Sequence, residues 1–141
     1  MNGSGFIHSR NSFAIHLIVK NISLYLMVFL YVIAGINHFL HPQSYMKIMP
    51  PSLPWPEALI YISGSFEIIS GLLLIPISTR RFAAWCIIIL LIIIFPANLQ
   101  MMLNYRHDGN PWFWITILRL PLQLLLIWWA YTFTKRTKAS T

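Results

Sequence analysis

Two ionisable side chains stand inside long apolar stretches of this sequence. Glu67 lies near the middle of the stretch 58–77, and Arg119 lies seven residues into the stretch 112–133. Charged residues at membrane depth are rare and usually face a bundle interior or a wet cavity, so they are the first candidates for function. Because a hydrogen-bonded pair costs far less than two isolated charges, we predict that Glu67 and Arg119 face one another, directly or through water.

Small residues surround Glu67 at helical spacing. Ser63, Gly64, Ser70 and Gly71 lie three or four positions away, on the same helix face. Small side chains let a second helix approach closely, so the carboxylate is expected to point into a helix–helix contact.

Further polar residues lie near the C-terminal ends of the first and third apolar stretches, which a four-span bundle places on the same side of the membrane. In the third and fourth stretches, Pro96 and Pro121 each remove a backbone donor and weaken the helix. Weakened helices leave room for a polar pocket in the outer half of the bundle. Six residues are predicted to line this pocket, none of them assigned a catalytic role: Asn37, His38, Glu67, Asn98, Arg119 and Gln123.

A purely structural role is the competing interpretation of these residues. Interhelical polar contacts commonly serve only to hold a bundle together, and we favour that role for Asn37, Asn98 and Gln123. For Glu67 and Arg119 both roles stay open, because uncharged residues would serve a structural role equally well.

The sequence predicts no metal site and no covalently bound cofactor. His38 and His41 have the spacing of ligands on one helix face, but no third ligand lies close to them in the sequence. Cys86 is the only cysteine, which excludes a dithiol relay within the chain. We expect this cysteine to serve as a small apolar residue within a helix.

The composition requires a membrane around these residues. The 141 residues are 57% hydrophobic and 9% charged, with a mean hydropathy of +0.67. So few charges cannot cover the surface of a small soluble protein, which excludes a soluble enzyme.

The expected fold is all-α, an integral membrane four-helix bundle that forms one membrane domain over residues 1–141. Continuous apolar runs of this length cross about 30 Å of hydrocarbon as helices. The four runs cover about residues 22–40, 58–77, 82–103 and 112–133. The residues before 22 are expected to form a short interfacial lead. The connection 41–56 holds five prolines, which discourage a regular helix, and we expect it to form a rigid cap in the outer headgroup region.

Basic residues set the orientation, because the cytoplasmic side of a membrane protein carries more of them. Lys47 and Arg106 fall on one side of the predicted membrane. The other side carries seven basic residues: Arg10, Lys20, Arg80, Arg81, Lys135, Arg136 and Lys138. Both the N- and C-termini are therefore expected in the cytoplasm. The basic residues are scattered over short connections, where they suit anionic lipid headgroups, and no nucleic-acid partner is predicted.

Three short motifs follow one another along the chain: AGINHF at 34–39, Glu67 with SGLLL at 70–74, and FPAN at 95–98. Together with the four-span plan, they resemble the DoxX family over about residues 23–134. The resemblance implies a small multi-pass protein of the cytoplasmic (inner) membrane of a prokaryote. It also implies relatives among subunits associated with quinol oxidase and thiosulfate:quinone oxidoreductase, although most members of that family have no assigned activity.

The leading expectation is a non-catalytic or quinone-associated subunit of a membrane redox system. The chain has neither a haem-binding Cys-x-x-Cys-His nor a Gly-rich dinucleotide loop, so a quinone or a partner redox protein would carry the electrons. Two alternatives remain, a membrane scaffold or chaperone without a small-molecule ligand and a small proton-coupled transporter. The small-residue face of the second span also permits a homodimer.

Overall fold

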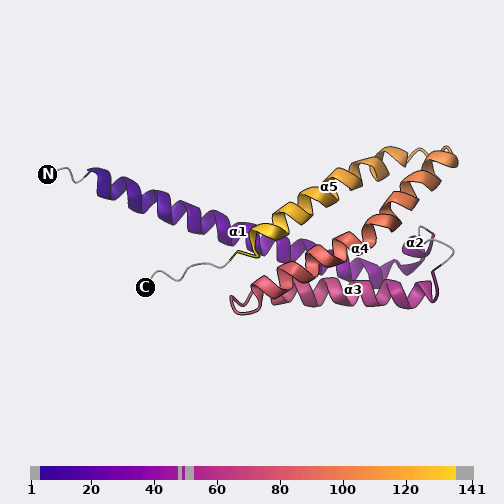
Figure 1. Cartoon of the computed structure of the whole chain (residues 1–141), viewed down its shortest axis with the longest axis horizontal. Helices are drawn as coiled ribbons and strands as arrows, with labels where there is room; N and C mark the ends of the chain where they lie inside the picture. Colours follow the sequence, from indigo (N-terminus) through magenta and orange to yellow (C-terminus); the bar gives the residue numbers. More distant parts are fainter. Residues whose placement is uncertain (1–3, 48, 50–52, 136–141) are drawn as a thin grey trace.

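A computed structural model describes residues 4–47, 49 and 53–135 of the protein. Its successive long helices run antiparallel to one another (Figure 1). No strand occurs within these residues. The helices are α1 (Ser4–Leu40), α2 (Pro42–Met46), α3 (Pro56–Leu73), α4 (Arg80–His107) and α5 (Phe113–Thr132). They form two helical hairpins, α1 with α3 and α4 with α5, as Figure 1 shows. We call the end with the α3–α4 turn (74–79) the basal end, and the end with the α4–α5 turn (108–112) the distal end.

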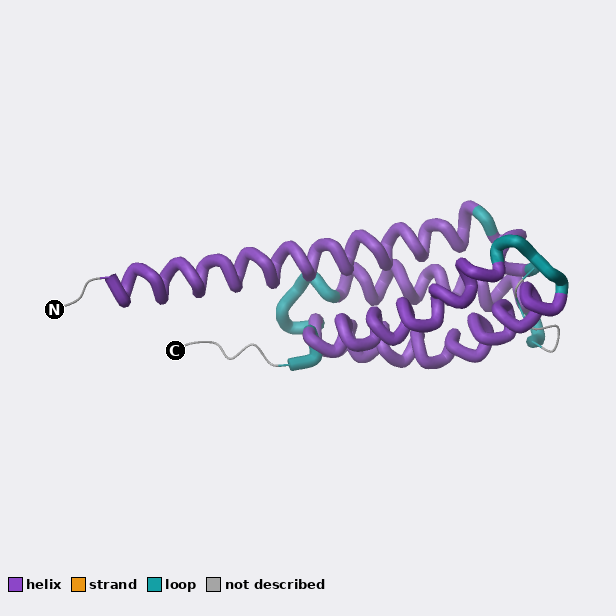
Figure 2. The backbone as a smooth tube through the Cα atoms, turned by 90° about the horizontal axis from the view of Figure 1, so that it is seen from above, coloured by secondary structure: helices purple, strands orange, loops and turns teal. Residues whose placement is uncertain are grey.

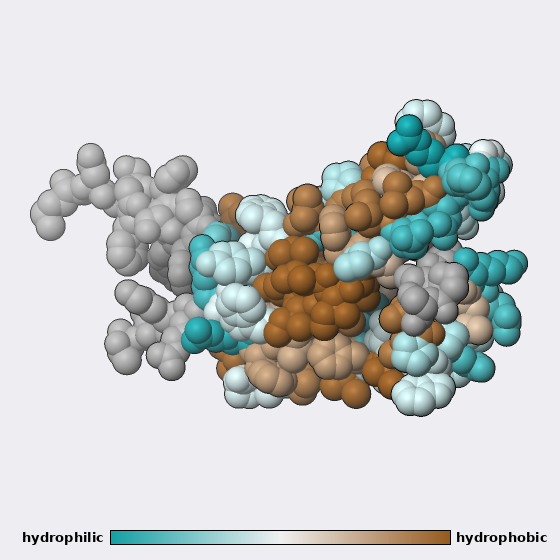
Figure 3. Space-filling model, turned by 45° about the vertical axis from the view of Figure 1, so that its right-hand side comes forward, coloured by the Kyte–Doolittle hydropathy of each residue, from teal (hydrophilic) through white to brown (hydrophobic). Residues whose placement is uncertain are grey.

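Three helices are long and apolar enough to cross a membrane, which indicates a multi-pass membrane protein. Their apolar segments are Ala14–Leu40, Arg80–His107 and Phe113–Thr132. Figure 3 shows an apolar band across the middle of the molecule, with hydrophilic residues gathered toward its ends. The helix α3 is absent from this set of three, because Glu57, Glu67 and several serines and glycines lower its hydropathy.

The first helix is longer than expected. It begins at Ser4, well before the predicted span, so the expected short lead is part of one continuous helix. No proline interrupts this segment, and nothing in it ends a helix. At ~1.5 Å per residue, α1 is about 55 Å long. Figure 2 shows its N-terminal part extending past the other helices at the basal end.

The proline-rich connection between the first two long helices contains one helical turn. We expected its prolines to prevent a regular helix, but Pro42 occupies the first turn of α2, where its missing N–H is not needed. Residues 48 and 50–52 of this connection lie outside the described residues, so the predicted rigid cap is described only in part.

The turn between α3 and α4 is closed by side chains. The Thr79 hydroxyl donates to the Leu73 carbonyl oxygen at 2.7 Å. Arg80 donates from Nε to the Leu74 carbonyl at 2.9 Å and from Nη2 to the Ile75 carbonyl at 2.8 Å. These bonds satisfy carbonyls that the end of α3 leaves without helical partners. The helix α3 ends before the predicted residue 77, because Pro76 has no N–H with which to continue it.

The apolar core lies at the basal end, where all four long helices meet. Trp129 of α5 donates from its indole nitrogen to the Ser23 hydroxyl of α1 at 2.7 Å. Toward the distal end the α4/α5 hairpin diverges from the α1/α3 hairpin (Figure 1). The buried core residues are Leu24, Met27, Val28, Tyr31, Leu74, Ala83, Ala84, Ile87, Ile88, Leu91, Ala130 and Phe133.

Glycines bring α1 and α3 into backbone contact. A Cβ added to Gly35 would lie 2.5 Å from the Gly64 carbonyl oxygen, and one added to Gly64 would lie 2.7 Å from the His38 Cβ. At Gly71 the nearest atom, the Tyr31 Cβ, is farther away at 3.1 Å. The close helix approach that the small residues around Glu67 predicted is therefore confirmed, and α1 is the partner helix.

Replacing Gly35 by alanine should separate α1 from α3. The added methyl group would overlap backbone atoms that cannot rotate away, so we expect Gly35→Ala to destabilise the protein by ~1–3 kcal/mol. Thermal unfolding in mild detergent measures this loss. Gly71→Ala is the matched control and should cost clearly less, because its neighbour leaves more space. Equal midpoints for wild type and Gly35→Ala would show that the contact is not tight.

Candidate functional site

An acid–base pair of a buried Glu67 and a partly buried His38 joins α1 to α3. The Glu67 side chain is on the α3 face between Gly64 and Gly71, and the residue is only 6% exposed. Its Oε2 atom lies 3.6 Å from Nε2 of His38. On the other side of the imidazole ring, Nδ1 lies 3.2 Å from the Ile60 carbonyl oxygen. The pair lies beside the close contact between α1 and α3 at Gly35 and Gly64.

The helix directions explain why these two side chains meet. Side chains lean toward the N-terminus of their own helix, which for α3 is the distal end. Glu67 therefore leans toward His38, which lies close to the distal end of α1. Glu67 follows the start of α3 at Pro56 by eleven positions, which places it ~16 Å below the distal end.

The short helix α2 covers the pair on the distal side. The Tyr45 ring stacks on the His38 ring with centroids 3.9 Å apart and an angle of 29° between the ring planes. The Tyr45 hydroxyl also accepts a hydrogen bond from Nδ2 of Asn37 at 2.8 Å. Asn37, one of the six predicted pocket residues, therefore binds the Tyr45 hydroxyl of α2.

Tyr31 is a buried neighbour that the sequence reasoning missed. It is 6% exposed, and its hydroxyl lies within electrostatic range of Glu67. Its hydroxyl oxygen and Glu67 Oε2 are both buried without a hydrogen-bond partner in the described part of the chain. The available signal was spacing, because Tyr31 precedes His38 by seven residues and so shares its helix face.

A second polar cluster joins α4 to α5. Nδ2 of Asn98 donates to Oε1 of Gln123 at 2.9 Å, and Nε2 of Gln123 donates to the Leu91 carbonyl oxygen. Gln123 is only 3% exposed. These amides satisfy one another, which is what a structural tie between two membrane helices requires. The structural role favoured for Asn98 and Gln123 is consistent with this geometry.

The predicted direct contact between Glu67 and Arg119 does not form. Nη1 of Arg119 instead lies 3.5 Å from the Met101 sulfur atom, and the side chain is exposed. The physical reason is packing, because α5 pairs with α4 while α1 fills the space beside Glu67. Arg119 is still close enough to His38 for the two side chains to interact electrostatically. The six predicted residues thus belong to two hairpins, with Asn37, His38 and Glu67 on the α1/α3 hairpin and Asn98, Arg119 and Gln123 on the α4/α5 hairpin.

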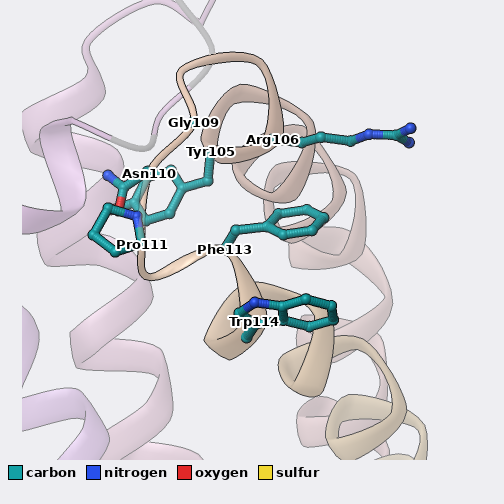
Figure 4. A pocket seen from close by; sticks show the side chains of 7 residues that line it. All are labelled: Tyr105, Arg106, Gly109, Asn110, Pro111, Phe113 and Trp114. Atoms are coloured by element: carbon teal, nitrogen blue, oxygen red, sulfur yellow. The ribbon is translucent and has the colours of Figure 1, made fainter.

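One cavity lies at the α4–α5 turn, away from these residues. It has a volume of about 350 Å³, and Figure 4 shows Arg106, Phe113 and Trp114 extending to the same side of it. The turn has Gly109 at φ 60°, and Oδ1 of Asn110 accepts a hydrogen bond from the Trp112 backbone N–H. None of the six predicted residues is in its lining, which comprises Tyr105, Arg106, Gly109, Asn110, Pro111, Phe113 and Trp114.

The described residues show no group of three His, Cys, Asp or Glu side chains that could hold a metal ion. His41 is exposed just beyond the end of α1 and does not join His38 in a site. Cys86 is a free, half-buried thiol within α4.

One family model matches this chain. Its description is "Domain of unknown function (DUF8561)", and it covers residues 27–134, well over half of the chain. The chain belongs to this family. No curated protein and no solved structure matches the chain.

Proposed function

We propose that this family member crosses the cytoplasmic membrane of a prokaryote four times, with both termini in the cytoplasm. In this arrangement α3 crosses the membrane in addition to the three helices that are long and apolar enough by themselves. It packs along α1, and its Glu67 is buried inside the protein. Its outward residues Ile62, Ile69 and Leu72 are exposed and apolar, as a lipid-facing surface requires.

The charges at the two ends support this orientation. Four described basic residues lie toward the basal end: Lys20 within α1, Arg80 and Arg81 at the start of α4, and Lys135 after the end of α5. The predicted contributions of Arg136 and Lys138 lie outside the described residues, as does the side chain of Arg10. Near the distal end the basic residues are Lys47 and Arg106. More positive charge at the basal end favours the cytoplasm for that end.

Within the membrane, the proposed role is that of a quinone-associated subunit of a membrane redox system, in line with the DoxX resemblance. The observation that carries this role is the His38–Glu67 pair, which lies between α1 and α3 with Glu67 buried. A quinone needs two electrons and two protons for reduction. The pair would hold one of these protons, the second proton would come from water, and a partner redox protein would supply both electrons.

Arg119 would orient the quinone ring. In the described part of the chain its guanidinium donates only to the Met101 sulfur, a weak acceptor, so most of its N–H groups are available. It lies on the hairpin that faces His38, within electrostatic range of that ring. A quinone carbonyl oxygen between the hairpins would accept a hydrogen bond from Arg119.

A membrane scaffold without a small-molecule ligand is the second candidate. The Asn98–Gln123 tie favours it, because each of the two amides already donates to a partner on the α4/α5 hairpin, as in a structural contact. Large apolar side chains remain exposed on every long helix, which is suitable for lipid or for a partner membrane protein.

Engineered cysteines test whether α3 crosses the membrane. In a Cys86→Ala background, Gln43→Cys on α2 and Ser78→Cys in the basal turn lie at opposite ends of α3. We expect a membrane-impermeant thiol reagent to label Gln43→Cys in intact cells and Ser78→Cys only in inverted vesicles. Labelling of both cysteine variants from the same side of the membrane would show that α3 does not cross it.

Mass spectrometry of the purified protein tests the quinone. We expect wild-type protein purified in mild detergent to retain quinone. Glu67→Gln should retain at least ~10-fold less quinone than wild type, because the pair loses its acid. Glu57→Gln is the matched control, since Glu57 is exposed on the same helix and should leave retention unchanged. A stoichiometric protein partner with no quinone in all three samples would favour the scaffold.

A further inference from the structure

We infer that His38 and Glu67 hold one proton between them as a neutral carboxyl–imidazole pair, and that α2 controls access to this proton from the distal side. The inference rests on the membrane placement in the proposed function and deepens the role given to this pair. It does not depend on a quinone being bound.

The Ile60 carbonyl fixes the tautomer of His38. A carbonyl oxygen only accepts hydrogen bonds, so the Nδ1 atom that lies 3.2 Å from it carries a hydrogen. In the neutral ring, Nε2 then has a lone pair and no hydrogen. That lone pair faces Glu67 Oε2 at 3.6 Å.

An ionised Glu67 would therefore place two acceptors opposite each other. Oε2 is shielded from solvent and has no hydrogen-bond donor in the described residues. A buried carboxylate without a donor is strongly unfavourable. One proton between Oε2 and Nε2 removes the conflict, because it turns one of the two acceptors into a donor.

The surroundings favour a neutral pair over a carboxylate with an imidazolium. Separating two opposite charges inside hydrocarbon requires desolvating both, whereas the neutral form avoids this cost. Arg119 on α5 is close enough to oppose a positive charge on His38. The other ionisable groups that face the pair, Tyr31 on α1 and Tyr45 on α2, are phenols and supply no counter-charge. The proton therefore resides on Glu67.

The cover over the pair is small and is held by few contacts. The helix α2 has five residues, and Tyr45 attaches it to α1 through the ring stack on His38 and the hydrogen bond from Asn37. The pair is closed below by the basal core that includes Tyr31. Displacing Tyr45 is thus the shortest way for water from the distal side to reach His38.

Infrared spectroscopy of the purified, quinone-free protein tests the location of the proton. The chain has only three acidic side chains, so a protonated-carboxyl C=O band can be assigned by substitution. At neutral pH we expect this band in wild type and in the control Glu57→Gln, and we expect it to vanish in Glu67→Gln. Its absence from wild type, or its persistence in Glu67→Gln, would overturn the inference.

Two further variants test the partner and the cover. In His38→Leu the band should move to the higher frequency of a carboxyl without an acceptor, whereas the control His41→Leu should leave it unchanged. In Tyr45→Ala, exchange of this proton in D₂O should be at least ~10-fold faster than in wild type. An unmoved band in His38→Leu would exclude the shared proton, and unchanged exchange in Tyr45→Ala would exclude the cover.

The outcomes separate this inference from the proposed function. A Glu67 band in protein that never retains quinone would support the proton pair and reject the quinone role. Quinone retention that depends on Glu67, with no protonated-carboxyl band, would support the role and reject the neutral pair.

Discussion

The contact between the backbones of α1 and α3 is the constraint on which the rest of the structure depends. Gly35 and Gly64 let the two helices approach until no side chain fits between them. Protein encloses a polar residue beside such a contact, so only the side chains of the two helices next to it can reach it. Glu67, three positions after Gly64, is therefore paired with His38 and buried near Tyr31. The unusual feature of this membrane protein is an acid held in place by close packing.

The same constraint divides the molecule into two hairpins. Because α1 occupies the space beside Glu67, α5 packs on α4 and its polar residue Gln123 finds its partners there. The hairpins share a core only at the basal end, where Ser23 and Trp129 connect α1 to α5. Toward the distal end the two hairpins diverge (Figure 1). Arg119 lies within electrostatic range of His38, and in the described residues its guanidinium contacts the Met101 sulfur of its own hairpin. An acid–base pair on one hairpin and a cation on the other is the arrangement that the proposed ligand site uses.

Sequence reasoning predicted the elements well and the side-chain partners poorly, for physical reasons. Apolar runs long enough for a bilayer identify helices directly, and small residues around Glu67 identify a close helix contact. The partner of Glu67 depends on how each helix is rotated about its axis, which spacing along one chain does not specify. Arg119 was a reasonable partner by charge and depth, but His38 is the one in reach. The distal cavity was missed because it is shaped by the turn at Gly109.

The central claim is that Glu67 interacts with His38 across the α1–α3 contact, and a double-mutant cycle measures that interaction directly. Unfolding free energies in detergent would be compared for wild type, Glu67→Gln, His38→Gln and the double variant, with a parallel cycle of Glu67→Gln and Arg119→Gln. The account predicts a coupling of ~0.5–3 kcal/mol between Glu67 and His38, and a coupling below ~0.5 kcal/mol between Glu67 and Arg119. A large coupling to Arg119 with none to His38 would contradict it.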